Sequence, residues 1–401
     1  MTYPPLWPAE VETRIRAEAS NLDEQRTPTE VKFCTRCVMS NQRPRIVFDE
    51  EGVCSACRHA ERKRTKIDWP ARHDELVDLL DKVRDDGPYN VVVPCSGGKD
   101  SSTVAWRLKN EYGMKPLCVK WAPFVETDIG RQNLDALVQS GFDVIEMMPN
   151  GILHRRLARL AFEYLGDHFQ PFVFGQLAFP MHMAVRMGVR LVFGAENGEA
   201  TYGGDPSADE KRCWDYDEWE RVYLKGSGIQ KLIQIGRDTG AFTEADVHSL
   251  SPFYNLPSRE LLKDVQYHWL AHYVDHHPQG NYYFASEHTG FMANTERSVG
   301  TYSKYASIDD ATDDWHYFLS WIKFGLGRAT SDAAHEMRDG DLEREEALEL
   351  VKRYDGEFPP SDKYELFKDY LGLDDEQFER VIDRFRPLHL GRITCPGGQR
   401  V

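Results

Sequence analysis

A glycine loop between a valine-rich run and a helix is the feature that most constrains how this chain can fold. Residues 90–94 (NVVVP) predict a buried strand, and the segment from about Asp100 to Tyr112 predicts a helix. The sequence SGGKDSS at 96–102 joins them. Its two glycines allow a sharp turn that exposes backbone N–H groups, and the N-terminus of a helix attracts an anion. We therefore predict a phosphate-binding loop at the edge of a parallel sheet.

The side chains of this loop suit a nucleoside triphosphate. Lys99 adds a positive charge, the serine hydroxyls add donors, and Asp100 could hold Mg²⁺ between phosphate oxygens. The loop differs from a Walker A motif, because an aspartate follows the lysine and no glycine stands five residues before Gly98. A tight turn with an incidental lysine is the alternative. The residues predicted to bind ATP are Ser96, Gly97, Gly98, Lys99, Asp100, Ser101 and Ser102.

Strand and helix patterns alternate through the middle of the chain, which favours an α/β fold with a parallel sheet covered by helices on both faces. Further strands are expected at 117–121, 143–147 and 190–193, and helices at 69–85, 128–139, 152–166 and 174–187. The strand at 190–193 ends in a second polar, glycine-rich loop, GAENGEATYGG. Because ligands bind at the carboxyl ends of parallel strands, the two loops should share one rim of the sheet.

The pattern becomes helical after about residue 257. Candidate helices lie at 258–276, 310–324, 329–338, 343–353, 361–370 and 374–384. In the first of them His268, His272 and His276 recur every four residues, and we expect an ordinary aromatic helix face rather than a catalytic metal site. The 401 residues allow roughly two to three domains. We expect an N-terminal extension (1–30), a ribbon (31–66), a nucleotide-binding domain (67–256) and a helical C-terminal region for substrate or partner (257–401).

Four of the eight cysteines form two C-x-x-C pairs separated by sixteen residues, Cys34 with Cys37 and Cys54 with Cys57. This spacing predicts a closed, tetrahedral zinc ribbon with a structural role. An iron–sulfur cluster and unligated thiols are the alternatives. The remaining cysteines stand singly: Cys95, Cys118, Cys213 and Cys395. A disulfide framework is therefore not expected, and with no leader or long apolar run visible we expect a cytoplasmic protein.

Charge is unevenly distributed along the chain. Lys and Arg number 49 against 65 Asp and Glu, a net charge of −16, so binding to nucleic acid or to an anionic membrane is not expected. The segment 32–66 is basic instead, with nine Lys and Arg against four acidic residues. A solvated face would account for this, and so would a docking surface for an acidic partner or a phosphate-bearing substrate.

The phosphate loop resembles the PP-loop of the ATP pyrophosphatases, which cleave ATP between its α and β phosphates. Over residues 33–358, the motifs CTRC, CSAC, PCSGGKDSS, GAENGEATYGG and TYSKYASIDDATDDWHYFLSWIKFGLGRATSDA resemble the N-acetyl sugar amidotransferases, the group that includes pseudaminic acid and B-band lipopolysaccharide enzymes. The resemblance implies a PP-loop domain over 67–256. It also implies that the acetamido group of a nucleotide-linked sugar, commonly a UDP-linked uronic acid, becomes an acetamidino group while ATP yields AMP and pyrophosphate.

Further site residues are expected under this resemblance. Glu196 and Glu199 could hold a metal or take a proton from incoming ammonia, or they could simply cap their loop. The candidates for binding the phosphates and carboxylate of the sugar nucleotide are Tyr302, Lys304, Lys323 and Arg328, with an exposed helix lysine as the alternative for both lysines. An acidic cluster is expected to mark a helix N-terminus: Asp309, Asp310, Asp313 and Asp314.

The sequence does not identify the nitrogen donor or the molecule that accepts the nitrogen. The sequence shows no glutaminase motif, because Cys95 lies in the phosphate loop rather than in a G-x-C-x-G elbow. The resemblance implies a separate glutaminase subunit that supplies ammonia, and the basic ribbon is its expected dock. Two other functions compete with this one: a tRNA thiolation enzyme, and a nucleotide-sensing scaffold without catalysis. Amidation of a non-sugar amide or carboxylate is a further alternative, since a fold and a loop do not fix the acceptor.

Overall fold

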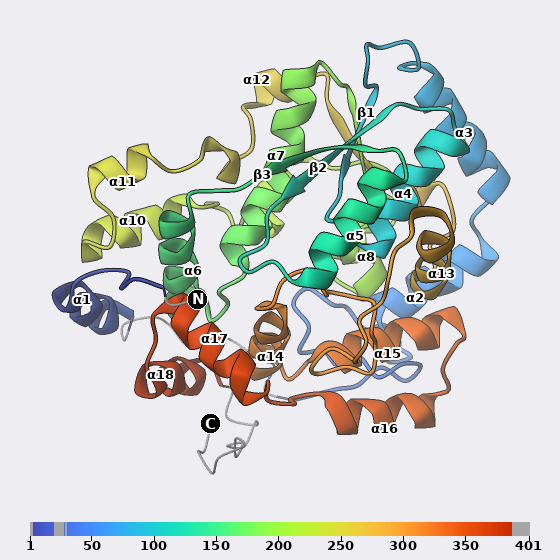
Figure 1. Ribbon diagram of the computed structural model, residues 1–401. Helices are drawn as coiled ribbons and strands as arrows, with labels where there is room; N and C mark the ends of the chain where they lie inside the picture. The colour runs from blue at the N-terminus through green and yellow to red at the C-terminus, as the bar shows by residue number, and fades with distance from the viewer. Residues whose placement is uncertain (1–2, 20–27, 29, 387–401) are drawn as a thin grey trace.

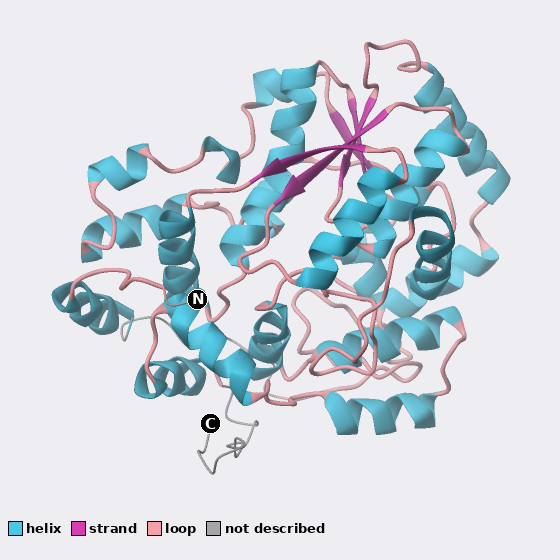
Figure 2. Ribbon diagram, in the orientation of Figure 1, coloured by secondary structure: helices cyan, strands magenta, loops and turns pink. Residues whose placement is uncertain are grey.

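A parallel sheet forms the centre of the protein, which we describe from a computed structural model for residues 3–19, 28 and 30–386. Its five strands stand in the order β3-β2-β1-β4-β5. Figure 2 shows the strands in magenta among the surrounding helices. They are β1 (Val91–Pro94), β2 (Pro116–Trp121), β3 (Asp143–Met147), β4 (Leu191–Gly194) and β5 (Gln266–Trp269). Every pairing is parallel, and Val92 of β1 stands opposite Leu117 of β2 and Val192 of β4. The predicted parallel α/β sheet is confirmed, with four strands where the sequence indicated them.

Helices cover both faces of this sheet. On one face, Val91 and Val93 pack against α3 (Trp69–Asp81), α4 (Lys99–Asn110) and α5 (Asp128–Gln139). On the other face, Val92 packs against α6 (Gly151–Leu165) and α7 (Gln170–Met187). Successive side chains of a strand point to opposite faces, so a strand covered on both faces must be apolar at every position. This is why the run of valines at 91–93 specifies a central strand.

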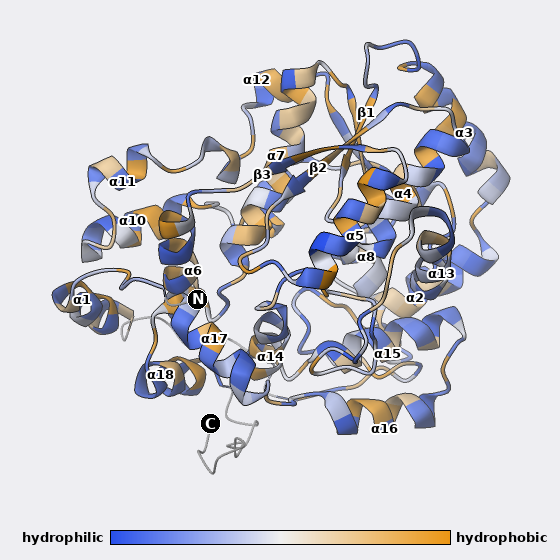
Figure 3. Cartoon of the chain, viewed as in Figure 1, coloured by the Kyte–Doolittle hydropathy of each residue, from blue (hydrophilic) through white to orange (hydrophobic). Residues whose placement is uncertain are grey.

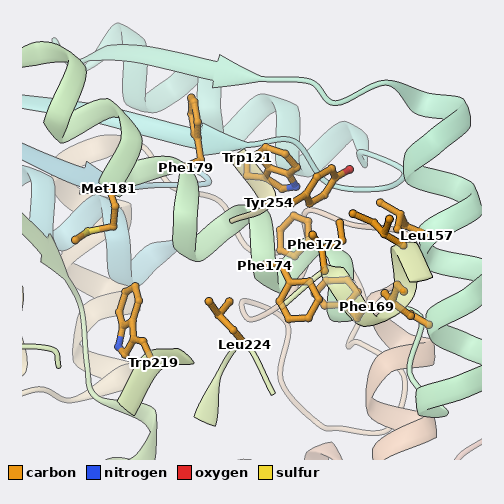
Figure 4. Packing of buried hydrophobic residues seen from close by; sticks show 14 of the residues in the cluster. Trp121, Leu157, Phe169, Phe172, Phe174, Phe179, Met181, Trp219, Leu224 and Tyr254 are labelled. Atoms are coloured by element: carbon orange, nitrogen blue, oxygen red, sulfur yellow. The ribbon is translucent and has the colours of Figure 1, made fainter. Parts of the chain in front are cut away.

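The larger core lies between the sheet and α7 (Figure 4). Trp121 ends β2 and packs between Phe179 and Tyr254, with ring centroids 6.2 and 5.0 Å away. A side chain at Gly175 of α7 would overlap the Trp121 ring, so glycine permits this approach. Burying one such aromatic ring stabilises the fold by about 1.5–3 kcal/mol. Figure 3 shows that the outer helices carry both hydrophilic and hydrophobic residues, as expected for helices that bury one side.

The prediction of a single helix over 258–276 is wrong. Only Arg259–Leu262 is helical (α12), and the chain then forms β5 and a 3-10 turn at Leu270–His272. His268 therefore lies on a strand and His276 in the next loop, so the three histidines share no helix face. The edge of β4 offers unpaired backbone groups, and the aromatic side chains of β5 bury on both sides of the sheet. Those tertiary contacts outweigh the local helical periodicity.

Two groups of helices follow on the other side of the molecule from α3 and α12 (Figure 1). They begin after α13 (Pro278–Thr289), which the sequence reading missed. The helices predicted from 310 to 384 are confirmed as α14 (Asp313–Phe324), α15 (Arg328–Asp339), α16 (Arg344–Tyr354), α17 (Ser361–Leu371) and α18 (Asp375–Phe385). The helices α14, α17 and α18 surround Trp315 and pack on α6, whereas α15 and α16 pack on the cysteine ribbon through Ala333 and Ala347.

Shorter helices fill the connections. They are α1 (Ala9–Ala19), α2 (Ser55–Thr65), α8 (Gly198–Tyr202), α9 (Tyr216–Val222), α10 (Gln230–Thr239) and α11 (Glu244–His248), with 3-10 turns at Pro206–Ala208 and Pro252–Tyr254. In Figure 1, α1 lies beside α6 and α10, which it contacts. Within the described ranges, no helix has both the length and the apolar character needed to span a bilayer. Cys395 lies outside the described residues.

Candidate functional site

A cavity of about 700 Å³ opens at the carboxyl ends of β1 and β4. The strand order reverses here, because β1 is followed along the chain by β2 on one side and flanked by β4 on the other. Open parallel sheets hold their ligands at such a point. The loops that follow β1 and β4 both line the cavity, as expected, and much of the remaining wall comes from 303–317 and α15. The volume lies within the range of about 300–1,000 Å³ that is usual for small-molecule sites.

The phosphate loop enters the cavity as a tight turn. Gly97 has a φ of +89°, and a Cβ there would lie 2.7 Å from the backbone nitrogen of Leu134 in α5. Glycine alone fits this position. Gly98 is the N-cap of α4, and no side chain caps that helix, so the first N–H groups of α4 are available to an anion. Ser102 lies behind the loop, buried, and its hydroxyl has no partner among the described residues.

Lys99 and Asp100 form an ion pair at this turn. Lys99 Nζ lies 2.5 Å from Asp100 Oδ2, and the lysine side chain is only 7% exposed. Asn281 of α13 donates to Asp100 Oδ1 at 2.9 Å. Burial opposes ionisation of Asp100, but the Lys99 ammonium and these hydrogen bonds hold the pKa of the carboxyl below its ordinary value. Asp100 is therefore a carboxylate that could bind a divalent cation.

Asn281 extends this network toward the loop after β4. Its amide nitrogen also contacts His276 Nδ1 at 3.1 Å, and His276 Nε2 lies 3.7 Å from Glu196. Two predicted residues, Asp100 and Glu196, are thus connected through two that sequence reasoning missed. Pro278, at the first turn of α13, is the signal that could have revealed this helix and hence Asn281.

Glu199 has different surroundings from Glu196, which lines the cavity. The Glu199 carboxylate accepts hydrogen bonds from Arg45 Nε at 2.9 Å, from Arg45 Nη2 at 2.5 Å and from the backbone N–H of Asp205 at 2.8 Å. Burial raises the pKa of Glu199, yet these donors hold it below its ordinary value. Because Arg45 belongs to the cysteine ribbon, Glu199 anchors that ribbon to the sheet.

Arg328 is the predicted sugar-binding residue that the structure brings to the cavity wall. Its guanidinium donates to Asp332 and to the Ser307 hydroxyl at 3.1 and 2.9 Å, and lies 4.2 Å from the centre of the Tyr317 ring. The nearby Asp332 and the Tyr317 ring fix its plane. Arg328 could bind an anionic group of a ligand in this orientation.

The other three predicted sugar-binding residues do not line the cavity, although Tyr302 contacts a residue of its wall, Glu336. Tyr302 donates to Glu336, Lys304 to the carbonyl of residue 295, and Lys323 to the carbonyl of residue 165. Lys304 is exposed, in a loop rather than a helix. Lys323 is partly buried in α14, and burial lowers its pKa to about 8. The structure therefore does not bring these three together with Arg328.

Carboxyl groups dominate the polar wall of the cavity. They belong to Asp100, Glu196, Asp309, Asp310, Asp313, Asp332, Glu336, Asp339 and Asp341. Burial raises the pKa of Asp310 to about 6, of Glu336 to about 7 and of Asp313 to about 8. The expected acidic cluster does begin a helix at Asp313, but Asp309, Asp310 and Asp313 also face the cavity, whereas Asp314 pairs with Lys363. Phosphates would enter such a wall only together with cations, and the carboxylates suit Mg²⁺.

The other end of the cavity is apolar. Trp121 lines it together with residues at the start of α7: Phe169, Phe172, Val173 and Leu177. Trp121 Nε1 is buried and has no hydrogen-bond partner among the described residues. A flat aromatic ring with polar edges, such as a nucleobase, suits this surface. The cavity thus joins a loop that suits phosphates to a surface that suits a nucleobase.

The four ribbon cysteines converge as predicted. The Sγ atoms of Cys34 and Cys57 are 3.9 Å apart, those of Cys37 and Cys54 are 3.7 Å apart, and all four residues are buried. Tetrahedral zinc with bonds of about 2.3 Å holds its sulfur ligands about 3.8 Å apart, so this group could bind zinc. Isolated β-bridges join Phe33 to Ser40 and Phe48 to Cys54 in this ribbon, and the second pair leads into α2.

Comparison with known proteins adds one finding to this geometry. Residues 299–391 match the model of the family described as LPS biosynthesis protein WbpG-like, C-terminal domain. The matched segment includes the cavity wall from Ser303 to Asp341. No curated protein matches the chain. The match supports a role in lipopolysaccharide or sugar biosynthesis.

Proposed function

We propose that this chain is an ATP-dependent amidotransferase that converts the acetamido group of a nucleotide-linked N-acetyl sugar into an acetamidino group. The observation that carries the proposal is that one cavity joins the phosphate loop to the segment that matches the LPS biosynthesis domain. The first wall suits the phosphates of ATP, and the second belongs to a family of sugar biosynthesis. The motif resemblance to N-acetyl sugar amidotransferases supports the same activity.

The reaction would proceed in two steps. The acetamido oxygen attacks the α-phosphorus of ATP, the bond to the β-phosphate oxygen breaks, and pyrophosphate leaves. Ammonia then adds to the activated carbon, AMP leaves with the former amide oxygen, and the added nitrogen loses one proton. Adenylation is needed because an oxide is a poor leaving group, whereas AMP is a good one.

The residues of the cavity suit these steps. Lys99 and the N–H groups at the start of α4 would stabilise the negative charge that develops on the departing pyrophosphate. Asp100 would hold Mg²⁺, which supplies further positive charge to the phosphates when bound. Glu196 lines the cavity with its side chain 19% exposed, so it could accept the proton that the nitrogen loses.

The ammonia would come from a separate glutaminase subunit. Ammonium is the dominant species at neutral pH, so an enzyme that uses the free base gains from direct delivery. The basic ribbon is the proposed dock, because an acidic partner complements its charge.

The test is ATP-dependent formation of AMP. Purified protein is incubated with ATP, Mg²⁺, ammonium chloride and a panel of UDP-linked N-acetyl sugars, and AMP and the amidine product are measured by chromatography and mass spectrometry. We expect AMP only with a suitable sugar. Lys99→Met should lower AMP formation by about 100-fold or more, because it removes a charge-assisted contact to the phosphates. Lys109→Met is the matched control, since Lys109 lies on the same helix and contacts the carbonyl of Gly141 outside the cavity.

A sulfur-transfer function is the second candidate, and one observation favours it. Cys95 lines the cavity, and its buried thiol lies near enough to that of Cys118 in β2 to lower the pKa of Cys95, although the two cysteines stand singly in the sequence. The net charge of −16 and the acidic cavity wall argue against binding a polyanion such as tRNA. AMP formation with tRNA and none with any N-acetyl sugar would replace the amidotransferase by this alternative.

A further inference from the structure

One cation of the cavity wall has no counter-ion among the residues that the structure describes. Among the described residues, the Lys and Arg side chains that line the cavity are Arg43, Lys99, Lys120 and Arg328. Three of these have carboxylate partners: Lys99 pairs with Asp100, Lys120 with Glu126 and Glu146, and Arg328 with Asp332. Arg43 has no ion pair with any described residue, so its charge is available to a ligand.

The surroundings of Arg43 make an unpaired charge costly. Its Nε is shielded from solvent and has no hydrogen-bond partner in the described ranges. Its guanidinium carbon lies 5.8 Å from the centre of the Tyr202 ring, which is a weak substitute for an anion. Burial lowers the pKa of Arg43, against the opposing influence of Glu199. An anionic group of a bound ligand would stabilise a buried, unpaired guanidinium of this kind.

The ribbon holds Arg43 in a fixed position. Two residues further on, the ion pair between Arg45 and Glu199 ties the ribbon to the loop after β4. Other ribbon cations contact residues away from the cavity: Arg58 pairs with Asp49, Glu51 and Glu61, and Arg62 with Asp209. Among the described ribbon residues, Arg43 is the one that lines the cavity. It also lies within electrostatic reach of Arg338 in α15, inside the segment that matches the LPS biosynthesis domain.

We propose that Arg43 binds the diphosphate of the nucleotide sugar, so that the metal ribbon completes the site of the second substrate. This inference rests on the proposed function. The guanidinium plane presents paired donors that match two phosphate oxygens, which a lysine cannot reproduce. The phosphates of ATP already have the loop at 96–101. The ribbon is then part of the substrate site as well as the proposed dock for a partner.

The test measures binding of the two substrates separately. Isothermal titration of UDP and of UDP-N-acetylglucosamine is carried out on protein saturated with Mg²⁺ and α,β-methylene ATP, which occupies the phosphate loop without reacting. The affinity for α,β-methylene ATP is measured in a second titration. The variants are Arg43→Met and Arg43→Lys, with Arg36→Met as the control, because Arg36 lies on the same ribbon and pairs with Glu61 at 3.2 Å. Thermal unfolding and the zinc content establish that each variant is folded.

We expect Arg43→Met to weaken the binding of both UDP ligands by at least about tenfold. Arg43→Lys should weaken it less, because lysine keeps the positive charge but lacks the paired N–H donors of the guanidinium. Arg36→Met should change the affinity for both UDP ligands by less than about twofold. The affinity of every variant for the ATP analogue should also change by less than about twofold. Equal loss with UDP and with the UDP sugar identifies the diphosphate, while loss with the sugar alone would assign Arg43 to the sugar and overturn the proposal.

Three results would contradict this role, and they are distinct from failure of the proposed function. Unchanged binding of UDP by Arg43→Met would exclude it. Weaker binding of the ATP analogue by Arg43→Met would assign the residue to ATP. Wild-type protein that binds the ATP analogue but neither UDP ligand would also overturn the diphosphate assignment. Failure of the amidotransferase function, by contrast, would be seen as absence of AMP formation with every N-acetyl sugar.

Discussion

Breaking the ion pair between Arg45 and Glu199 separates an anchoring role from a catalytic one. Arg45→Met removes both donors at 2.9 and 2.5 Å and leaves a carboxylate whose side chain is only 7% exposed. Loss of one partner from a fully buried pair costs about 3–5 kcal/mol, and loss of an exposed pair costs about 0.2–1 kcal/mol. The Arg45 side chain is 37% exposed, so we expect an intermediate cost of about 2 kcal/mol.

The assay is urea unfolding followed by fluorescence and circular dichroism, with Arg36→Met as the matched control. The Arg36 pair is exposed on both sides, so its loss should cost less than about 1 kcal/mol. The pKa of Glu199 is lower in the folded protein than in the unfolded chain. The stabilisation is therefore fully present above the ordinary pKa of a glutamate and is lost as the pH falls through the lower, folded-state value. The difference between Arg45→Met and wild type should shrink on acidification.

Two results would refute this reasoning. A free energy of unfolding for Arg45→Met within about 0.5 kcal/mol of wild type would show that the pair does not anchor the ribbon. A difference that stays constant down to acidic pH would show that its origin is not electrostatic. The catalytic expectation for Glu199 is tested in parallel: at a temperature where both variants are folded, Glu199→Gln should retain more AMP formation than Glu196→Gln, because Glu196 lines the cavity.

The remaining predictions concern the loop, the metal and the acidic wall. Gly97→Ala should lower AMP formation by about 100-fold, because its Cβ would meet the backbone of α5, whereas Gly188→Ala, with a φ of +67° and open space around it, should cost only about 1–2 kcal/mol of stability. Cys37→Ser should abolish stoichiometric zinc, measured by plasma mass spectrometry, and lower the unfolding temperature. Asp313→Asn should stabilise the ligand-free protein relative to wild type, and increasingly so as the pH rises toward 8. Burial raises the pKa of Asp313 to about 8, so the wild type loses stability over this pH range because ionisation is more favourable in the unfolded chain. Unfolding curves at several pH values check this.

Local patterns predicted those elements that the chain specifies by itself. The valines at 91–93, the loop at 96–102 and the amphipathic helices from 310 to 384 each carry their own periodicity or turn residues, and each is found where expected. The prediction of a helix over 258–276 was wrong for a physical reason. Its apolar spacing fits a helix, but β4 offers an edge for pairing, and the aromatic side chains of β5 gain more from the two cores than from a helix.

The residues of the candidate site likewise include some that the sequence identified and some that only the structure revealed. The phosphate loop, Glu196 and Arg328 were identified from their motifs and line the cavity. Asn281 was missed because a lone asparagine has no sequence signature, and its role depends on the packing of α13 against α4. Arg43 was seen only as one of nine basic residues in the ribbon. Its distinction is the lack of a counter-ion, which depends on where every carboxylate of the fold lies.

The sequence by itself determined the chemistry that short segments contain. Two adjacent glycines after a buried strand specify a tight turn into a helix, and two C-x-x-C pairs specify a four-sulfur site, because both depend on backbone geometry and ligand spacing over a few residues. The tertiary structure alone decided which charges are paired. It engaged Glu199 with Arg45 and left Arg43 without an ion pair to any described residue, since ion pairing depends on distances between residues that lie far apart in the chain.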